Sequence, residues 1–176
     1  MRSIISFLCL TVVLSLSASA FAADKENTLY IDLKDGRVVI EMLPKVAPKH
    51  VEQIKKLARE GKYDGVVFHR VIDGFMAQTG DPQGTGMGGM GDKLPAEFSK
   101  EPHVRGAVSM ARTNDPNSAQ SQFFIVLKDS NFLDGQYTVW GRVTSGMEFV
   151  DKIKKGEPPA NPDKMIKVRV AADVKE

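Results

Sequence analysis

The chain has almost no cysteine, and its single copy lies close to the N-terminus. Cys9 is the only cysteine among 176 residues. It falls inside an apolar run from Ile4 to Leu16 that follows the basic residue Arg2. A basic start, a short apolar run and small residues after it are typical of a secretory signal peptide. Without that segment the chain has no cysteine, which excludes a disulfide, a thiol nucleophile and a cysteine-bound metal.

The signal peptide is predicted to cover residues 1–22. The small residues that flank Phe21 favour cleavage after Ala22, with cleavage after Ala20 as the alternative. The apolar run is shorter than the roughly 20 residues that a membrane span requires, so an uncleaved anchor is the less favoured interpretation. Residues 23–176 then form one domain of ordinary size, which we expect to be free of the membrane after cleavage.

The chain also lacks an excess of charge and the usual motifs of hydrolases and metal sites. The formal net charge of +2 falls to +1 without Arg2, so nothing in the charge supports a nucleic acid partner. No G-x-S-x-G motif is present. The histidines His50, His69 and His103 form no H-x-x-x-H pair, so we expect no zinc site, no other metal and no cofactor.

Short apolar stretches, many of them with alternating side chains, predict a mainly β protein. Helical spacing is confined to residues 48–60 and to a segment that begins at Ser145, where a capping box with Glu148 precedes an apolar stripe. We expect one closed eight-stranded antiparallel β-barrel, capped by these two α-helices. The expected strands are residues 28–33, 37–43, 68–72, 75–78, 106–111, 122–127, 138–143 and 165–170.

One predicted hairpin, residues 68–78, concentrates chemically distinctive side chains. It carries Arg70, Phe75, Met76 and Gln78 around an Asp-Gly turn. A plain interpretation makes the apolar pair core residues and Arg70 a solvated charge. Arginine does not lose its proton in proteins, so in a functional site Arg70 serves only as a fixed donor and positive charge.

Two further stretches bear on a binding site. Phe123 and Phe124 are adjacent in a predicted strand and must point to opposite faces, so one fills the core and the other needs a groove. Residues 84–89 match G-x-G-x-x-G, but residues 94–98 do not begin a helix, so a dinucleotide site is rejected in favour of a mobile glycine loop.

Three blocks of sequence resemble the cyclophilins, a family of peptidyl-prolyl cis/trans isomerases that bind cyclosporin. They are F-H-R-V-I-D-G-F-M-A-Q-T-G-D, S-M-A-R-T-N-D-P-N-S-A-Q-S-Q-F-F-I and F-L-D-G-Q-Y-T-V-W-G-R-V. The similarity runs from about Thr28 to Val174, and the signal peptide and the M-A-R-T loop are similar to the bacterial periplasmic branch. The resemblance implies a monomeric periplasmic enzyme that accelerates rotation about X-Pro bonds and assists the folding of exported, proline-containing polypeptides.

The resemblance also assigns roles to single residues. It makes Arg70 the catalytic arginine and gives a proline pocket of Phe75, Met76, Phe124 and Leu133. Residues that bind the substrate backbone and flank the pocket are Gln78, Ala111, Gln122 and Arg112, the last of which replaces a common asparagine. Phe132 and Tyr137 replace a tryptophan and a histidine of eukaryotic members, which implies weak cyclosporin binding.

Two other functions stay open at this point. A non-catalytic proline-peptide-binding module or holdase would use the same fold, and a nucleotide-binding protein would use the glycine loop. His69 lies next to Arg70 in the predicted strand and is expected on its other side, as a structural histidine.

Overall fold

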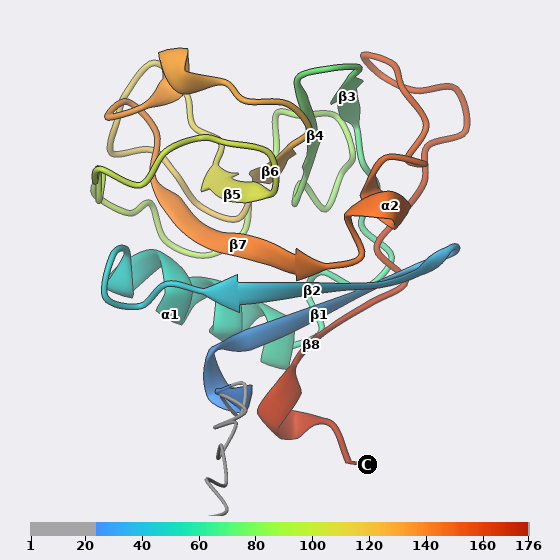
Figure 1. Ribbon diagram of the computed structural model, residues 1–176, viewed down its shortest axis with the longest axis horizontal. Helices are drawn as coiled ribbons and strands as arrows, with labels where there is room; N and C mark the ends of the chain where they lie inside the picture. Colours follow the sequence, from blue (N-terminus) through green and yellow to red (C-terminus); the bar gives the residue numbers. More distant parts are fainter. Residues whose placement is uncertain (1–23, 176) are drawn as a thin grey trace, which may run out of the picture.

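The computed structural model describes residues 24–175, so the predicted signal peptide lies outside the described residues. Eight antiparallel strands form a single sheet, accompanied by two α-helices and three short 3-10 helices (Figure 1). The strands are β1 (Thr28–Leu33), β2 (Gly36–Met42), β3 (Arg70–Ile72), β4 (Met76–Thr79), β5 (Ala107–Met110), β6 (Phe123–Val126), β7 (Val139–Ser145) and β8 (Lys167–Val170). The helices are α1 (Pro48–Arg59), α2 (Met147–Val150), η1 (Lys25–Asn27), η2 (Asn131–Leu133) and η3 (Ala171–Asp173).

The sheet is open, and the predicted closed barrel is wrong. The strand order is β3-β4-β6-β5-β7-β2-β1-β8, so β3 and β8 are the two ends and do not pair with each other. Across this gap the described residues form the isolated bridges Val67 to Lys164 and Val71 to Gly156 and a few single backbone hydrogen bonds, but no continuous ladder. Figure 1 shows the sheet curving from β3 and β4 at the top, through β7, to β1, β2 and β8 at the bottom.

The composition of the segment before β8 explains why the sheet stays open. Residues 154–166 contain Gly156 and the prolines Pro158, Pro159 and Pro162, and the Glu157–Pro158 peptide bond is cis. Proline has no N–H to donate to a strand ladder, and β3 facing it is only three residues long. The connector therefore crosses the gap without forming a continuous ladder.

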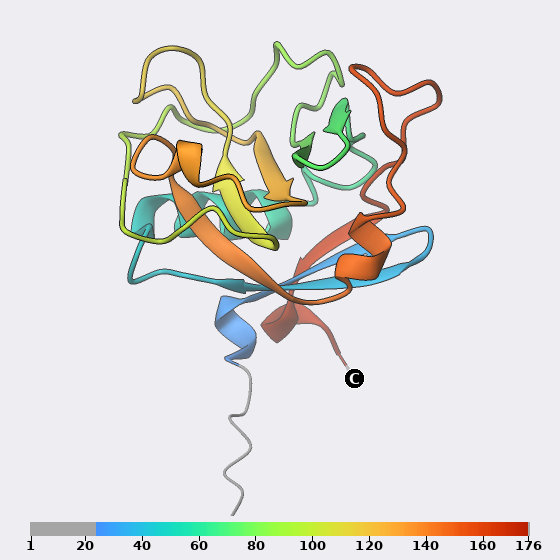
Figure 2. The same cartoon turned by 45° about the horizontal axis from the view of Figure 1, so that its top comes forward.

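Helix α1 follows its predicted span closely. Its buried apolar face consists of Val51, Ile54, Leu57 and Ala58. The helix begins at a proline, whose missing N–H would be unpaired in the first turn anyway. Gly61 adopts a φ of 67° just after the helix and ends it. The helix covers one side of the curved sheet, where it contacts β8, and it lies behind β7 in the turned view (Figure 2).

Helix α2 is a single turn, and the predicted capping box does not form. Ser145 is the last residue of β7, and the N-cap position is occupied by Gly146 with a φ of 90°. No side chain makes a capping hydrogen bond there. Because Ser145 pairs with Val39 of β2, it is held in extended backbone and cannot cap the helix.

The buried apolar residues form two clusters on opposite faces of the sheet. Strand β6 supplies both, with Phe123 and Ile125 in the larger cluster and Phe124 and Val126 in the smaller one. The larger cluster fills the space between the sheet and α1 and includes Trp140. Opposite burial of Phe123 and Phe124 was predicted from strand alternation and is confirmed. The smaller cluster supports the site described below.

Within residues 24–175, no helix has the length and apolar character needed to cross a membrane. The two ends of the described chain meet, because η1 and η3 contact each other at the bottom of Figure 1.

Candidate active site

Strands β3 and β4 form the hairpin predicted from the sequence. Arg70 pairs with Gln78, and Ile72 pairs with Met76. These positions alternate with core residues, so their side chains share one face. Gly74 turns the chain with a φ of 66°, a conformation that glycine adopts without steric cost. The hairpin thus presents a cation, an amide and two apolar side chains together.

A cavity of about 710 Å³ opens over this face. Most of the predicted site residues line it, namely Arg70, Phe75, Met76, Gln78, Ala111, Arg112, Phe124, Leu133 and Tyr137. The cavity is also lined by residues that were not assigned to the site, namely His69, Gly84, Thr85, Gly86, Glu157 and Pro158. The structure therefore brings together distant segments, such as those of Arg70 and Glu157, which lie 87 residues apart in the chain.

The floor of the cavity is apolar and fixed by aromatic packing. Met76, Phe124 and Leu133 are all buried. The ring of Phe124 lies 6.0 Å from the ring of Tyr137 in an edge-on arrangement and 6.2 Å from the stacked ring of His103. Such contacts restrict the Phe124 ring to one orientation. The floor therefore accepts a compact apolar group and offers little to a charged one.

Phe132 lies outside this cavity, although it was predicted to bind substrate. The residue is 66% exposed, and its ring centroid lies 5.6 Å from that of Phe75. Phe132 therefore stands at the rim, where it extends the apolar surface beyond the cavity wall.

Gln122 is also outside the main cavity and supports it from an adjoining hollow of about 170 Å³. Its side-chain oxygen accepts a hydrogen bond from Gln78 Nε2 at 2.9 Å. Its Nε2 donates to the carbonyl oxygens of Gly86 at 3.0 Å and Gly88 at 2.7 Å. Gln122 thus orients the Gln78 amide and ties the glycine loop to the sheet.

The glycine loop is organised around the buried carboxylate of Asp81. The backbone N–H groups of Gln83, Thr85, Gly86 and Gly88 all donate to its two oxygens, at 2.7–3.2 Å. Burial alone would raise the pKa of Asp81, but these hydrogen bonds outweigh it and lower the pKa below its ordinary value.

These bonds also bear on the rejected dinucleotide site. The loop N–H groups that a phosphate would need already donate hydrogen bonds to the carboxylate of Asp81. No helix follows the loop within the described residues, because the next element after β4 is β5. The loop lacks the strand-to-helix setting that places a pyrophosphate at a helix N-terminus.

Arg112 builds one wall of the cavity. Its guanidinium lies 4.5 Å from the ring centroid of Tyr137 and donates two hydrogen bonds to the carbonyl of Gln136 and one to that of Thr113. Most of its donors are therefore used within the chain. Arg112 holds Tyr137 in place while contributing a positive charge beside the cavity.

Arg70 has a different environment. Its Nε donates to Glu157 Oε2 at 2.7 Å, and the two side chains are 43% and 51% exposed. No other hydrogen bond of the Arg70 side chain occurs within residues 24–175, so its two terminal nitrogens remain available on the cavity side. Sequence reasoning missed Glu157, because no local pattern near it indicates a contact so distant in the chain.

His69 lies in the cavity wall, contrary to the prediction from strand alternation. Strand β3 begins only at Arg70, so the alternation does not extend to His69. Its ring is buried, and neither ring nitrogen has a hydrogen-bond partner among the described residues. Burial lowers the pKa of His69, with the nearby charge of Asp81 opposing it. A buried neutral ring beneath Gly86 suits a structural role.

The other two histidines are paired with carboxylates. His50 Nδ1 lies 2.7 Å from Glu97 Oε2, and His103 Nδ1 lies 2.9 Å from Asp134 Oδ1. Within the described part of the chain, no three histidine, cysteine or acidic side chains gather closely enough to hold a metal ion.

Comparison with known proteins agrees with this geometry. The family model described as cyclophilin type peptidyl-prolyl cis-trans isomerase/CLD matches residues 28–171. A probable peptidyl-prolyl cis-trans isomerase of Brucella suis is 57% identical over 184 aligned positions, which cover 93% of each chain. Peptidyl-prolyl cis-trans isomerase B of Bacillus subtilis is 45% identical and covers 74% of this chain and 93% of its own.

Solved structures show the same fold. The cyclophilin AquaCyp293 from Hirschia baltica matches with a TM-score of 0.80 and 33% identity, covering 87% of this chain and 77% of its own. A cyclophilin type isomerase from Cryptosporidium parvum, crystallised in the presence of the dipeptide Ala-Pro, matches with a TM-score of 0.76 and 28% identity. That match covers 81% of this chain and 98% of the other.

Proposed function

The chain belongs to the cyclophilin-type peptidyl-prolyl cis-trans isomerases, and from this premise we propose that Arg70 is the group that accelerates its reaction. The observation that carries the proposal is the guanidinium of Arg70 beside a buried apolar floor in one cavity. A donor that keeps its proton, next to a pocket for an apolar ring, suits a reaction without proton transfer.

The chemistry of the X-Pro bond explains what such a site must do. The peptide bond resists rotation by about 18–20 kcal/mol because the nitrogen shares its lone pair with the carbonyl, and X-Pro bonds exchange over roughly tens to hundreds of seconds. As the bond twists, the lone pair localises on the prolyl nitrogen. A guanidinium that donates to this nitrogen stabilises the twisted state more than either planar state.

The remaining groups confine the rotation to one bond. In this proposal Met76, Phe124 and Leu133 hold the pyrrolidine ring, while Gln78 and the backbone near Ala111 fix the peptide on one side. Lowering the barrier by on the order of 6 kcal/mol would bring the exchange into milliseconds, because each ~1.4 kcal/mol is tenfold in rate. Fixing one side of the rotating bond also removes part of the entropic cost of reaching the transition state.

A protease-coupled assay on an X-Pro peptide tests the proposal. We expect Arg70→Ala to lose most of the isomerase activity, by about 100-fold as for other groups that stabilise developing charge. Arg70 is 43% exposed on a short strand, so the variant should keep its fold and its circular dichroism spectrum. Unchanged turnover would remove Arg70 from the mechanism, and an inactive wild-type protein that still bound the peptide would favour a binding module or holdase.

We also propose that the enzyme acts in the periplasm, as a monomer, on exported proline-containing polypeptides. The support is the signal-peptide pattern of residues 1–22, with its favoured cleavage after Ala22. Cell fractionation with N-terminal sequencing tests this, since an N-terminus at Ala23 in the periplasmic fraction is expected. Recovery of the full-length chain in the cytoplasm would contradict it.

A further inference from the structure

The contact between Arg70 and Glu157 lies in the wall of the cavity. The Nε group of Arg70 is 2.7 Å from Glu157 Oε2, and both residues line the cavity. This contact uses the inner edge of the guanidinium, the edge closest to the backbone. No hydrogen bond among the described residues uses the two terminal nitrogens at the other end, so they can donate to a bound peptide.

The backbone brings these two side chains together. Val71 and Gly156 form an isolated antiparallel bridge in which each N–H donates to the other carbonyl at 2.8 Å. In an antiparallel pairing, the residue before one partner faces the residue after the other, so Arg70 faces Glu157. The ion pair is therefore a cross-strand pair built into the gap between β3 and β8.

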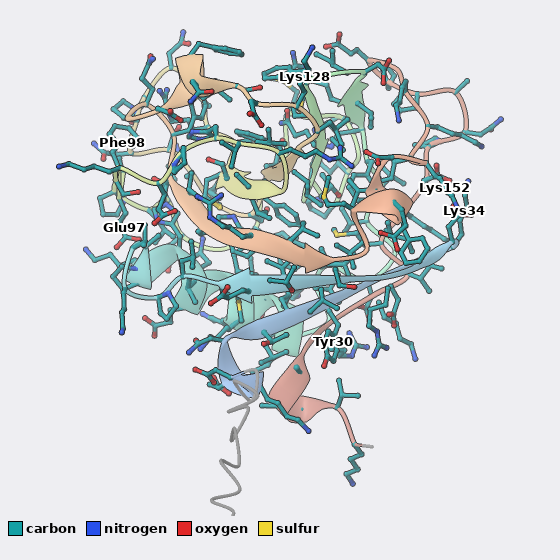
Figure 3. The ribbon with its side chains drawn as sticks, in the orientation of Figure 1. Tyr30, Lys34, Glu97, Phe98, Lys128 and Lys152 are labelled. Carbon is teal, nitrogen blue, oxygen red and sulfur yellow. The ribbon has the colours of Figure 1, made fainter. Side chains whose placement is uncertain are left out.

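The connector that carries Glu157 is anchored without help from its side chain. The carbonyl of Asp163 accepts the N–H of Phe68 at 2.9 Å, and its carboxylate accepts the N–H of Lys154 at 2.9 Å. The same carboxylate forms an ion pair with Lys34 at 2.8 Å. Lys34, which is labelled in Figure 3, lies at the tip of the β1–β2 hairpin. Replacing the Glu157 side chain should thus leave the connector in place.

We propose that Glu157 is a positioning residue for Arg70, which holds the guanidinium in the orientation that the proposed reaction needs. This inference rests on the proposed function. A free arginine side chain samples many rotamers and loses conformational entropy when it is fixed. A carboxylate on Nε removes part of that freedom before the substrate binds, so less is lost at the transition state.

The charge of Glu157 has an opposing effect that must be weighed. A carboxylate beside the guanidinium lowers the positive potential that the prolyl nitrogen meets. Both side chains are about half exposed, so water and salt screen this effect over the longer distance to the substrate. The hydrogen bond is short and directional, so its orienting effect is expected to dominate.

Three variants test the inference in the protease-coupled assay. Glu157→Ala should lower kcat by about 1.5-fold to fivefold, the range expected for an exposed pair, and leave KM within about twofold. Glu157→Gln should recover at least half of the lost kcat, because its side-chain oxygen still accepts the Nε hydrogen bond. The control Asp32→Ala breaks the Arg37–Asp32 pair, which has the same 2.7 Å Nε contact on another part of the sheet, and should leave kcat unchanged.

A fourth variant shows whether Glu157 acts through Arg70. Adding Glu157→Ala to Arg70→Ala should not lower the residual activity further, because the group that it orients is gone. The inference would be overturned if Glu157→Ala raised kcat or changed KM alone. It would also be overturned if Glu157→Ala lowered kcat by the same factor in the Arg70→Ala background as in the wild-type protein. If Arg70→Ala itself kept full activity, the proposed function would fail, which is a separate outcome.

Discussion

Phe132 lies at the cavity rim, where we expect it to affect the affinity for cyclosporin. It is 66% exposed and contacts Phe75, and it replaces a tryptophan that contacts cyclosporin in eukaryotic cyclophilins. We predict that Phe132→Trp raises the affinity for cyclosporin by about tenfold, because an indole adds apolar contact area and an N–H donor. Isothermal titration calorimetry with cyclosporin measures the change.

The matched control for this prediction is Phe98→Trp. Phe98 is 43% exposed and lies away from the cavity, on the side of the molecule where Figure 3 labels it. This variant adds the same indole without reaching the ligand. An equal increase in cyclosporin affinity in the two variants, or no increase in Phe132→Trp, would contradict the role assigned to Phe132.

For single residues, the sequence predicted those cavity residues that belong to a local pattern such as a hairpin. Arg70, Met76 and Gln78 share one face of a hairpin whose turn is visible in the sequence, and the structure places all three in the cavity. Glu157 was missed because its contact depends on an isolated bridge between distant segments. His69 was placed on the wrong side because it precedes the strand in which alternation holds.

At the scale of the elements, the junction of β7 and α2 depends on glycine. Gly146 has a φ of 90°, and a Cβ atom there would overlap the backbone carbonyl of Arg37. We predict that Gly146→Ala lowers the free energy of unfolding by about 3 kcal/mol or more, from backbone strain plus steric overlap. Urea denaturation measures the loss.

Gly74 provides the comparison at a second turn. It also has a positive φ, of 66°, but a Cβ atom there meets no neighbour within 4 Å. Gly74→Ala should therefore cost only about 1–2 kcal/mol, the cost of the left-handed conformation alone. If the two variants lost equal stability, the close approach at Gly146 would have no energetic consequence.

The elements themselves were largely predictable, and their ends and pairings were not. Alternating or continuous apolar runs indicated all eight strands, and an apolar stripe indicated α1. Ser145 matched a helix cap by its spacing, but its pairing with Val39 keeps it in β7. Tertiary pairing of this kind overrides a local capping signal and is not visible in the sequence around it.

For the whole molecule, the titration of buried groups predicts how stability depends on pH. Burial lowers the pKa of His69 and His103, so their neutral forms are favoured in the folded state. Unfolding then takes up protons below about pH 6.5, the ordinary histidine value, and stability falls as the pH drops further. Arg169 and Arg105 lower the pKa values of the carboxylates that they pair with, Asp64 and Asp151.

These carboxylates cause a second decrease in the free energy of unfolding at lower pH. A lowered folded pKa gives stability that is present above the ordinary value of about 3.9 and is lost as the pH falls below it. We therefore expect the free energy of unfolding to be greatest near neutral pH, to decline below about pH 6.5 and to decline again below about pH 4. Urea denaturation followed by the fluorescence of Trp140, the single tryptophan, measures it. A stability that rose between pH 7 and pH 5 would contradict this account.

The closure of the sheet was the main error at the scale of the whole molecule. Eight strands and two helices suggested a closed barrel, but a count of strands does not establish that the first and last strands meet. The proline-rich connector and the short β3 leave a gap there, and Glu157 faces Arg70 across this gap. The gap between β3 and β8 therefore accounts both for the open sheet and for the position of Glu157, which the sequence did not predict.

The most direct test of the account compares binding and catalysis in Arg70→Ala with one X-Pro peptide. NMR exchange spectroscopy measures the rate of cis/trans exchange at saturating peptide, and chemical-shift titration measures the affinity. We predict that the variant keeps the affinity within about fivefold while the exchange rate falls by about 100-fold, because the apolar floor binds the ring and the guanidinium stabilises the twisted bond more than the planar bond. An exchange rate that stayed at the wild-type level, or that fell only as far as the affinity did, would contradict it.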